Sequence, residues 1–594
     1  MKELIKKRIA GLRAEMIKMG LDAYIVFGTD PHLSEYLPEH WKTRPFVSGF
    51  TGSAGIAIIT ANKAALWTDS RYFLQAEDEL SGTEIELVKM RTSGYPEPAE
   101  WLKINLGKGS IVGTDEWCIS VSQFGQMQKS LHTDEISLKT SGDLLNGIWE
   151  NRPPLPNFPV FEHKINFACR DRKEKLDLIC SGLKKSGADL QIITALDDLA
   201  WTFNLRGSDV ECNPVFLAYA CVSPEQTTLF IDNKKLSAEI SKKLKSEGIQ
   251  VREYSEIINF LHELPKETTL LLDPNQTNQA IFENIPGHCK IIQELSIPCR
   301  LKAIKTEDEI RNIRQAMRKD GAAMVEFLFW LENNLGKIPV TEFTVAGKLN
   351  EFRSQQPDFK GISFFPIVGY KEHGAIVHFH VSEANALPIH KDGFLLFDSG
   401  GQYLDGTTDI TRTVALSELT AQQKKDFTLV LKGMISLTMA KFPVNTRGYH
   451  LDILARKDMW KHGLNYGHGT GHGVGYFLNV HEGPMSIRQE FNDRVIEPGM
   501  VLSNEPALYR FGEYGLRTEN IIVCIKDEST VFGDFLRFDT LTLCPIDIKA
   551  IDKSLLLPEE TTWLNSYHQK VYRELKPFLH EELQDFLKEL TKPL

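Results

Sequence analysis

Four carboxylates and one histidine in the last third of this 594-residue chain are of the types that bind divalent metal ions. They are Asp398 and Asp409 in FDSGGQYLDGTTDITRT, His472 in GHGTGHGVG, Glu505 in LSNEPALY and Glu519 in GLRTEN. Each segment alone is a weak signal, but all five occur on segments typical of neighbouring strands. We therefore predict that they converge on one site.

The two aspartates flank a predicted β-hairpin. FLLFD is an apolar run that ends at Asp398, DITRTVAL begins at Asp409, and Asp405–Gly406 between them is a strong hairpin-turn signal. A hairpin would bring the two carboxylates close together on adjacent strands. An isolated pair of this kind is usually structural, so the metal assignment depends on the other three residues.

The histidine segment is predicted to be extended or looping rather than helical. Glycine in the interior of a helix costs about 1 kcal/mol per residue, and this segment has glycine at every second position, namely Gly467, Gly469, Gly471, Gly473 and Gly475. Glycines also let the backbone approach a ligand closely. A lone histidine is more often a core residue than a ligand, but His468, His472 and His481 lie close together in the sequence.

The two glutamates lie next to apolar strands. Glu505 follows PGMVLS and precedes Pro506, and alternation in GLRTENIIVC places Arg517, Glu519 and Ile521 on one strand face. Burying unpaired charges is costly, so carboxylates on such apolar strands require cations.

The charge count favours two metal ions. Four carboxylates balance two divalent cations, whereas a single Zn²⁺ prefers more nitrogen or sulfur ligands. An oxygen-rich set with one imidazole favours Mn²⁺, with Co²⁺, Fe²⁺ or Zn²⁺ as alternatives. Two such ions, about 3.5–4 Å apart, can hold a bridging hydroxide and polarise a carbonyl, which is the chemistry of peptide hydrolysis.

The composition is that of a globular protein in the cytoplasm. A net charge of -11 argues against nucleic acid or an anionic membrane as partner, and no apolar run is long enough to span a bilayer. MKELIKKRIAGLRAEMIKMG reads as an amphipathic helix rather than a signal peptide. The nine cysteines include no CxxC pair, which favours free buried thiols in a reducing compartment.

Two breaks divide the chain into three expected domains, 1–155, 156–300 and 301–594. The first break is the proline-rich linker NRPPLPNFPVF, and the second lies near Ser296–Pro298, before a capping box made by Thr306 and Glu309. The first two domains contain short apolar strands such as DAYIVFG, GIAIITA, LQIIT and TTLFID. They read as α/β domains of similar size, which hints at a duplication. The third ends in a helical extension from Pro558 onward, with a packing or subunit-contact role.

These segments resemble the "pita-bread" metallopeptidases. DGTTDITRT, HGTGHGVGYFLNVHEGP, Glu505–Pro506 and GLRTEN look like their signatures. WTDSRY, LDDLAWTFNLRGSDVECNPVF, LKAIKTEDEI and WLNSYH extend the likeness over the whole chain, to the three-domain cytosolic type of Xaa-Pro aminopeptidase, or aminopeptidase P. The resemblance implies an α/β and α+β multidomain fold, with two creatinase-type N-terminal α/β domains before a pita-bread catalytic domain. It also implies a homodimer that cleaves peptides beginning with Xaa-Pro.

The resemblance assigns roles to individual residues. Asp398 would bind one metal, His472 and Glu505 the other, and Asp409 and Glu519 both. His378 and His481 match two substrate-facing histidines that could donate to the developing oxyanion, and Glu505 could carry the proton to the leaving nitrogen. His468 matches a residue beside the metal ligands, and Arg517 and Tyr509 match residues that support the site and the substrate. The family's implied activity removes one N-terminal residue before a proline.

Two departures and several alternatives remain. Residue 504 is Asn where some relatives have Asp, and residue 507 is Ala where Gly is common; neither is a ligand position. A prolidase restricted to Xaa-Pro dipeptides is the nearest alternative, and a non-catalytic peptide-binding relative is another. Methionine aminopeptidase needs no two preceding domains, and creatinase-like relatives lack the ligands.

Overall fold

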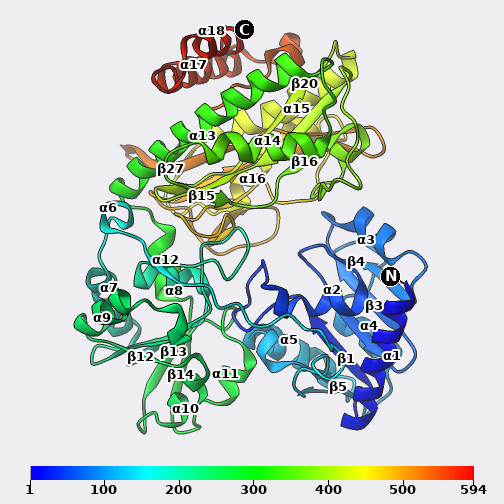
Figure 1. Cartoon of the computed structure of the whole chain (residues 1–594), viewed down its shortest axis with the longest axis vertical. Helices are drawn as coiled ribbons and strands as arrows, with labels where there is room; N and C mark the ends of the chain where they lie inside the picture. Colours follow the sequence, from blue (N-terminus) through cyan, green and yellow to red (C-terminus); the bar gives the residue numbers. More distant parts are fainter. Residues whose placement is uncertain (1) are drawn as a thin grey trace. The chain divides into compact units, whose positions relative to one another are not determined.

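The structure, a computed structural model, describes residues 2–594 and consists of two compact units (Figure 1). Unit 1 comprises the chain up to His163 together with Arg170–Pro298. Unit 2 comprises Lys164–Cys169 and Cys299–Leu594. The short helix α6 (Ile165–Ala168) therefore belongs to the C-terminal unit, although unit 1 precedes and follows it in the sequence.

The N-terminal helix α1 (Lys2–Met19) forms because its apolar residues recur every three or four positions and share one face. The buried members of this stripe are Ile5, Ile9, Leu12 and Met16. Lys6 and Lys7 between them are exposed. The predicted amphipathic helix is confirmed.

The first half of unit 1 contains a six-stranded mixed sheet. In spatial order its strands are β4 (Ile85–Lys89), β3 (Ala64–Thr68), β2 (Ile56–Thr60), β1 (Ala23–Phe27), β5 (Ile111–Thr114) and β6 (Ser137–Thr140). Strand β1 pairs antiparallel with β2 and parallel with β5. Tyr24 and Val26 enter one apolar core, while Ile25 and Phe27 enter a second core on the other face. The sheet is therefore buried on both sides, as in an α/β domain.

The second half of unit 1 repeats this sheet strand for strand. The order is β12 (Ile249–Arg252), β11 (Thr227–Phe230), β10 (Tyr219–Val222), β8 (Leu190–Ile193), β13 (Thr269–Leu272) and β14 (Lys290–Gln293). Its central strand β8 pairs antiparallel with β10 and parallel with β13, as β1 does with β2 and β5. Equal order and equal directions support the duplication suggested by the sequence.

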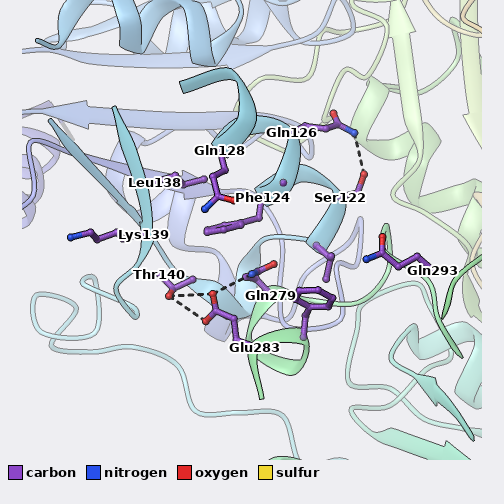
Figure 2. Close-up of a pocket in the computed structure, with 13 residues that line it drawn as sticks. Ser122, Phe124, Gln126, Gln128, Leu138, Lys139, Thr140, Gln279, Glu283 and Gln293 are labelled. Carbon is purple, nitrogen blue, oxygen red and sulfur yellow. Dashed lines mark hydrogen bonds between the residues drawn. The ribbon is translucent and has the colours of Figure 1, made fainter. Parts of the chain in front are cut away.

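A cavity of about 750 Å³ in unit 1 is lined by α5 (Val121–His132), β6, α11 (Gln279–Glu283) and β14 (Figure 2). Polar and apolar side chains line it. Gln279 donates to Glu283 Oε1 at 3.1 Å, and Thr140 Oγ1 donates to Glu283 Oε2 at 3.3 Å. None of the predicted metal ligands lines this cavity.

Unit 2 is built around antiparallel sheets. Its largest sheet has the order β21 (Lys441–Pro443), β28 (Gly533–Thr540), β27 (Asn520–Thr530), β24 (Val501–Asn504), β22 (Gly471–Gly473) and β23 (Glu482–Ile487). Three smaller sheets are β16 (Ile367–Tyr370) with β17 (Phe394–Ser399) and β20 (Ile410–Ala415), β15 (Phe359–Ile362) with β18 (Gly401–Tyr403) and β19 (Gly406–Thr407), and β25 (Ala507–Arg510) with β26 (Tyr514–Arg517). These strands carry or flank all five predicted ligands.

Four long helices pack on these sheets: α13 (Glu307–Asn334), α14 (Glu342–Ser354), α15 (Ala421–Thr438) and α16 (Gly448–Trp460). The predicted start of α13 is confirmed, since Thr306 Oγ1 accepts from Glu309 N at 3.2 Å and Glu309 Oε2 accepts from Thr306 N at 2.8 Å. Phe327 of α13 packs on Phe397 of β17, with ring centroids 5.1 Å apart.

The C-terminal extension forms α17 (Pro558–Leu575) and α18 (Glu581–Leu590), which confirms the predicted helical end of the chain. Leu564, Tyr567 and Val571 of α17 enter the same apolar core as Val430 of α15. The extension therefore packs as part of unit 2.

The free cysteine thiols, the proline-rich linker and the helices agree with the predictions made from composition. All nine cysteines are free thiols, as expected, although only Cys118, Cys221, Cys524 and Cys544 are buried. Residues 152–160 lie outside helices and strands, in agreement with the proline-rich linker. Among residues 2–594, no helix combines the length and the apolar character needed to cross a bilayer.

Candidate metal centre

The two aspartates lie on a pair of antiparallel strands. Asp398 is on β17 opposite Thr411 of β20, and Asp409 immediately precedes β20. The predicted turn at Asp405–Gly406 is present, because β18 and β19 pair with Tyr403 opposite Gly406. The chain between the aspartates is thus a second small hairpin, which returns Asp409 to the neighbourhood of Asp398.

His472 lies on β22 between Gly471 and Gly473. The backbone of the adjacent strands lies so close to these two positions that only glycine fits at them. A Cβ atom at Gly471 would lie 2.0 Å from the Ser503 carbonyl oxygen, and one at Gly473 would lie 2.2 Å from the Glu482 carbonyl oxygen. The alternating glycines therefore allow β22 to sit tightly between β23 and β24. The predicted extended conformation of this segment is confirmed.

Glu505 and Glu519 lie opposite each other, in a short gap between two antiparallel strand pairs that share one register. Asn504 of β24 pairs with Asn520 of β27, and Ala507 of β25 pairs with Arg517 of β26. The same register places Glu505 opposite Glu519, and both lie where the chain passes from the large sheet into the small one. The prediction that Glu519 is inside a continuous strand was wrong: β26 ends at Arg517 and β27 begins at Asn520.

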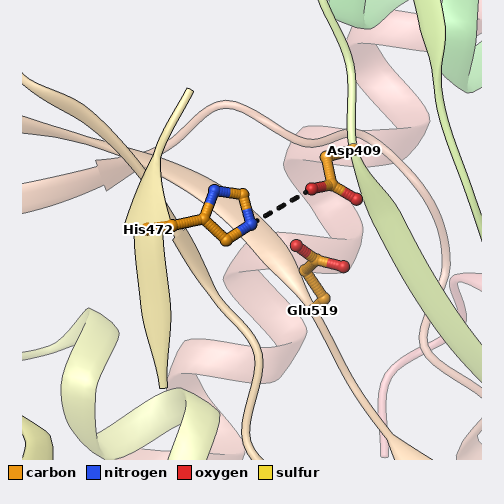
Figure 3. Close-up of side chains that lie close together, drawn as sticks. All are labelled: Asp409, His472 and Glu519. Atoms are coloured by element: carbon orange, nitrogen blue, oxygen red, sulfur yellow. Dashed lines mark ion pairs between the residues drawn. The ribbon is translucent and has the colours of Figure 1, made fainter. Parts of the chain in front are cut away.

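These segments bring the predicted ligands together. Potential ligand atoms of Asp409, His472 and Glu519 all lie within 4.8 Å of one another, and their side chains point toward a common space in Figure 3. His472 Nε2 is 3.4 Å from Asp409 Oδ2 and 3.4 Å from Glu505 Oε1. Figure 3 shows that the three residues come from separate strands or strand ends.

Asp398 is held at the edge of this cluster by a chain of hydrogen bonds. Arg517 Nη2 donates to Asp398 Oδ2 at 2.6 Å, and Arg517 Nη1 donates to the Tyr509 hydroxyl at 2.6 Å. The Tyr509 hydroxyl lies 2.9 Å from His468 Nε2. Arg517, Tyr509 and His468 therefore form a continuous support behind one of the predicted ligands.

Thr411 and Ser503 also support the ligands, although neither was predicted from the sequence. Thr411 Oγ1 donates to Glu519 Oε2 at 2.8 Å and accepts from Arg517 Nε at 3.0 Å. Ser503 Oγ accepts from His472 N at 3.0 Å and donates to Glu505 Oε1 at 3.1 Å. Ser503 precedes Glu505 by two positions, a spacing that puts two side chains of a strand on the same face and could have indicated it.

Two carboxylate oxygens in the cluster fit bound cations. Asp398 Oδ1 and Glu519 Oε1 are buried and have no hydrogen-bond partner within the chain. A buried unpaired carboxylate oxygen is costly unless a cation or donor satisfies it. With the neighbouring imidazole and carboxylates, these oxygens form the oxygen-rich donor set expected for divalent ions of the Mn²⁺ type.

The electrostatics of the chain alone also fit cations. Burial raises the pKa of Asp398 to about 7, opposed by Arg517 and reinforced by Asp409 and Glu505. Burial likewise raises the pKa of Glu505 and Glu519, with the charge of Asp409 contributing in both cases. Burial alone would lower the pKa of His472, but Asp409 and Glu505 raise it to about 9. Positive charge, from protons or metal ions, is thus favoured here.

The two predicted substrate-facing histidines lie in loops. The ring of His481 is 4.3 Å, centroid to centroid, from the ring of His472, so it borders the cluster. His378 is half-buried in the turn that follows the short helix η5 (Lys371–Ala375). Gly374 of η5 packs tightly on Gly515 of β26, because a Cβ atom at Gly515 would lie 1.6 Å from the Gly374 carbonyl oxygen.

At the first departure from the family pattern, the Asn504 side chain is bound to α15. Asn504 Nδ2 donates to the Met434 carbonyl oxygen at 2.8 Å and to Thr438 Oγ1 at 2.9 Å, so its side chain is buried against α15. Ala507 is buried in β25.

Family models match almost the whole chain. Residues 8–147 and 151–309 each match a creatinase/prolidase N-terminal domain. Residues 311–526 match metallopeptidase family M24, and residues 534–594 match the C-terminal region of peptidase M24.

Similar proteins span the full length of the chain. Aminopeptidase P1 of Arabidopsis thaliana is 37% identical, with 97% of each chain covered. Xaa-Pro aminopeptidase 1 of Dictyostelium discoideum is 37% identical, covering 100% of this chain and 97% of that protein. The crystal structure of an X-prolyl aminopeptidase from Caenorhabditis elegans, described as a cytosolic enzyme with a di-nuclear active site, matches with a TM-score of 0.95. That match has 33% identity and covers 99% of this chain and 100% of that chain.

Proposed function

This chain belongs to metallopeptidase family M24, among its Xaa-Pro aminopeptidases, and we propose that Asp398, Asp409, His472, Glu505 and Glu519 hold two divalent metal ions. It is a metal-dependent peptide hydrolase that removes the first residue of peptides with proline at position two. The predicted fold class, with two creatinase-type α/β domains before a pita-bread domain, is confirmed.

We propose for these five residues the ligand roles that the family resemblance implies. Asp398 and its free Oδ1 would serve one ion, and His472 with Glu505, 3.4 Å apart, would serve the other. Asp409 and Glu519, whose potential ligand atoms lie within 4.8 Å of each other and of His472, would contact both ions. The unpaired buried oxygens of Asp398 and Glu519 are the observation that carries this proposal. When bound, two such ions activate a water molecule and polarise the scissile carbonyl.

Side chains of this protein would transfer the proton, stabilise the developing oxyanion and hold the ligand Asp398 in place. Glu505 has a raised pKa, which suits a group that accepts a proton from the attacking water and returns it to the leaving proline nitrogen. His481, beside His472, and His378 would donate to the carbonyl oxygen as negative charge develops on it. Arg517, Tyr509 and His468 would keep Asp398 in position through the hydrogen-bond chain that joins them.

Proline selectivity has a chemical basis. The nitrogen of an X–Pro bond carries no hydrogen, so a site for it cannot depend on an amide donor. Selection would come from the shape of an apolar slot and from orientation of the bond. The free amine of the first residue would bind beside the metal ions, which limits cleavage to one residue.

Several finer features are part of the proposal. Mn²⁺ is the expected metal, because oxygen ligands outnumber the single imidazole. We also propose a cytoplasmic location, a homodimer, and domain borders near residues 155 and 300. The metal and the location are testable by metal analysis and by fractionation of the native source.

The activity is tested by release of arginine from Arg-Pro-Pro, Arg-Pro and Arg-Ala-Ala by the manganese-loaded enzyme, with and without chelator. We expect chelator-sensitive cleavage of Arg-Pro-Pro after arginine, with Arg-Ala-Ala left intact. Cleavage of Arg-Pro alone would instead identify a prolidase. No cleavage with any divalent metal would identify a non-catalytic peptide-binding protein.

A further inference from the structure

Arg412 of β20 is only 2% exposed, so its guanidinium depends on the protein for hydrogen bonds. Each of its three nitrogens donates to at least one acceptor in the chain. Its acceptors are the carbonyl oxygens of Pro545 (3.0 Å), Thr411 (3.0 Å), Glu519 (2.5 Å) and Cys544 (2.9 Å), Asn520 Oδ1 (2.9 Å) and the Tyr567 hydroxyl (3.0 Å). None of these acceptors is a carboxylate. The buried guanidinium therefore donates only to neutral groups, and these hydrogen bonds link several distant segments of the chain.

Two of these contacts reach the ligand segment. Arg412 Nη1 donates to the backbone carbonyl of Glu519 and to that of Thr411. The same Thr411 carbonyl accepts from Glu519 N at 3.2 Å, and Thr411 Oγ1 donates to Glu519 Oε2 at 2.8 Å. The backbone and carboxylate of Glu519 are thus fixed by Thr411 and Arg412 together.

The opposite end of this network is Tyr567 of α17, which is 4% exposed. Its hydroxyl accepts from Arg412 Nη2 and lies 2.9 Å from the Cys544 carbonyl oxygen, to which it can donate. A path of direct hydrogen bonds therefore runs from the C-terminal extension, through Tyr567 and Arg412, to Glu519.

We propose that Arg412 and Tyr567 are positioning residues through which α17 holds Glu519 in its metal-binding orientation. Groups that orient a ligand contribute to metal affinity although they do not touch the metal. Coupling between two sites is reciprocal, so metal binding at Glu519 also stabilises the docking of α17. The inference rests on the proposed role of Glu519 as a ligand.

The test is titration of the metal-free chain with Mn²⁺ alone, by calorimetry well below the unfolding temperature. Tyr567→Phe removes only the hydroxyl, and we expect at least one Mn²⁺ to bind about 10–100-fold more weakly. Glu560→Gln is the matched control on the same helix: Glu560 pairs with buried Lys432 of α15 at 2.5 Å and is not one of the hydrogen-bond acceptors of Arg412. This control should lower the unfolding temperature and keep wild-type Mn²⁺ affinity.

The outcomes separate this inference from the proposed function. If the wild-type chain binds no Mn²⁺, the proposed metal site is wrong. Suppose instead that the wild-type chain binds Mn²⁺. If Tyr567→Phe then binds Mn²⁺ as tightly as the wild type does, or as tightly as Glu560→Gln does, α17 has only a packing role and the inference is overturned.

A measurement on the wild-type chain covers the case in which Tyr567→Phe does not fold. Mn²⁺ should slow amide hydrogen exchange in α17 by a larger factor than in α18, which lies in the same extension and contains none of these hydrogen-bond acceptors of Arg412. Equal slowing of both helices, or no slowing, would overturn the coupling.

Discussion

Arg517 donates from Nη2 to Oδ2 of Asp398 at 2.6 Å, and both side chains are buried. This ion pair occupies one carboxylate oxygen and leaves Oδ1 without a partner in the chain. One guanidinium thus sets both the orientation and the charge of a predicted ligand.

Replacing Arg517 with Met should weaken Mn²⁺ binding about 10–100-fold, because Asp398 loses its orienting partner and its pKa, already about 7, rises further. Arg517→Lys keeps the charge and should recover part of the affinity. Calorimetric titration with Mn²⁺ measures both variants. If metal binding is unchanged and only the KM for Arg-Pro-Pro rises, Arg517 serves the substrate rather than the metal.

Asp409→Asn should abolish metal-dependent turnover while the fold is retained. Removal of a group beside the ligands already costs about 10–100-fold, so loss of a ligand should reduce kcat/KM by more than about 100-fold. Peptide cleavage and far-ultraviolet circular dichroism give the two readouts. Asp392→Asn, at an exposed aspartate just before β17, is the control and should keep full activity. Full activity of the Asp409→Asn variant would contradict the site assignment.

Mn²⁺ affinity should fall as the pH falls from 8 to 6. In the metal-free chain His472 has a pKa of about 9 and Asp398 a pKa of about 7, so both carry protons over much of this range. A metal ion must displace these protons, and each displaced proton changes the affinity by up to about tenfold per pH unit. Titrations at several pH values, in buffers of different ionisation enthalpy, measure the affinity and the protons released. An affinity that is independent of pH would contradict the predicted ligand set.

Acid should destabilise unit 2 through His568 of α17. Its Nε2 accepts from Ile546 N at 3.1 Å, and burial, with the charge of Arg412, lowers its pKa from 6.5 to about 4. Below pH 6.5 the unfolded chain binds a proton that the folded chain does not, so stability is lost as the pH falls from 6.5 to 4. The full loss is about 3 kcal/mol.

The urea midpoint of His568→Gln should therefore change less than that of the wild type between pH 7 and pH 5. The glutamine oxygen can replace Nε2 as the acceptor for Ile546 N. The variant therefore removes the group that titrates and keeps the hydrogen bond. Equal acid sensitivity of the two chains would show that His568 does not titrate in this range.

Asn504→Asp should destabilise unit 2 by about 1–3 kcal/mol, because it removes the amide donor to Met434 and leaves that buried carbonyl without this bond. The denaturation midpoint checks the prediction. Ala507→Gly, at the other departure from the family pattern, is a useful comparison because the alanine side chain makes no hydrogen bond. An Asn504→Asp variant as stable as the wild type would show that α15 adjusts to the change.

The sequence predicted much of this architecture because local signals were strong. Ala23–Phe27 and Leu190–Ile193 are short, mainly apolar runs rich in β-branched or aromatic residues, which favours buried strands, and Thr306 with Glu309 marks a helix start within four residues. The five ligand positions stood out because charged residues are rare beside such apolar strands.

The sequence could not predict features that depend on distant segments. Glu519 appeared to continue a strand, because an alternating pattern carries no sign that the chain changes sheets between Arg517 and Asn520. The bond from Arg412 to Tyr567 joins residues more than a hundred positions apart. Only the folded arrangement shows which buried acceptors surround that guanidinium.

The close packing beside His472 restricts how this enzyme can be engineered. Any side chain at Gly471 or Gly473 would collide with the backbone of a neighbouring strand, within 2.0 Å and 2.2 Å respectively. Randomised libraries that include these positions would consist mainly of misfolded clones. Diversity aimed at new peptide substrates is better placed in the loops that carry His378 and His481.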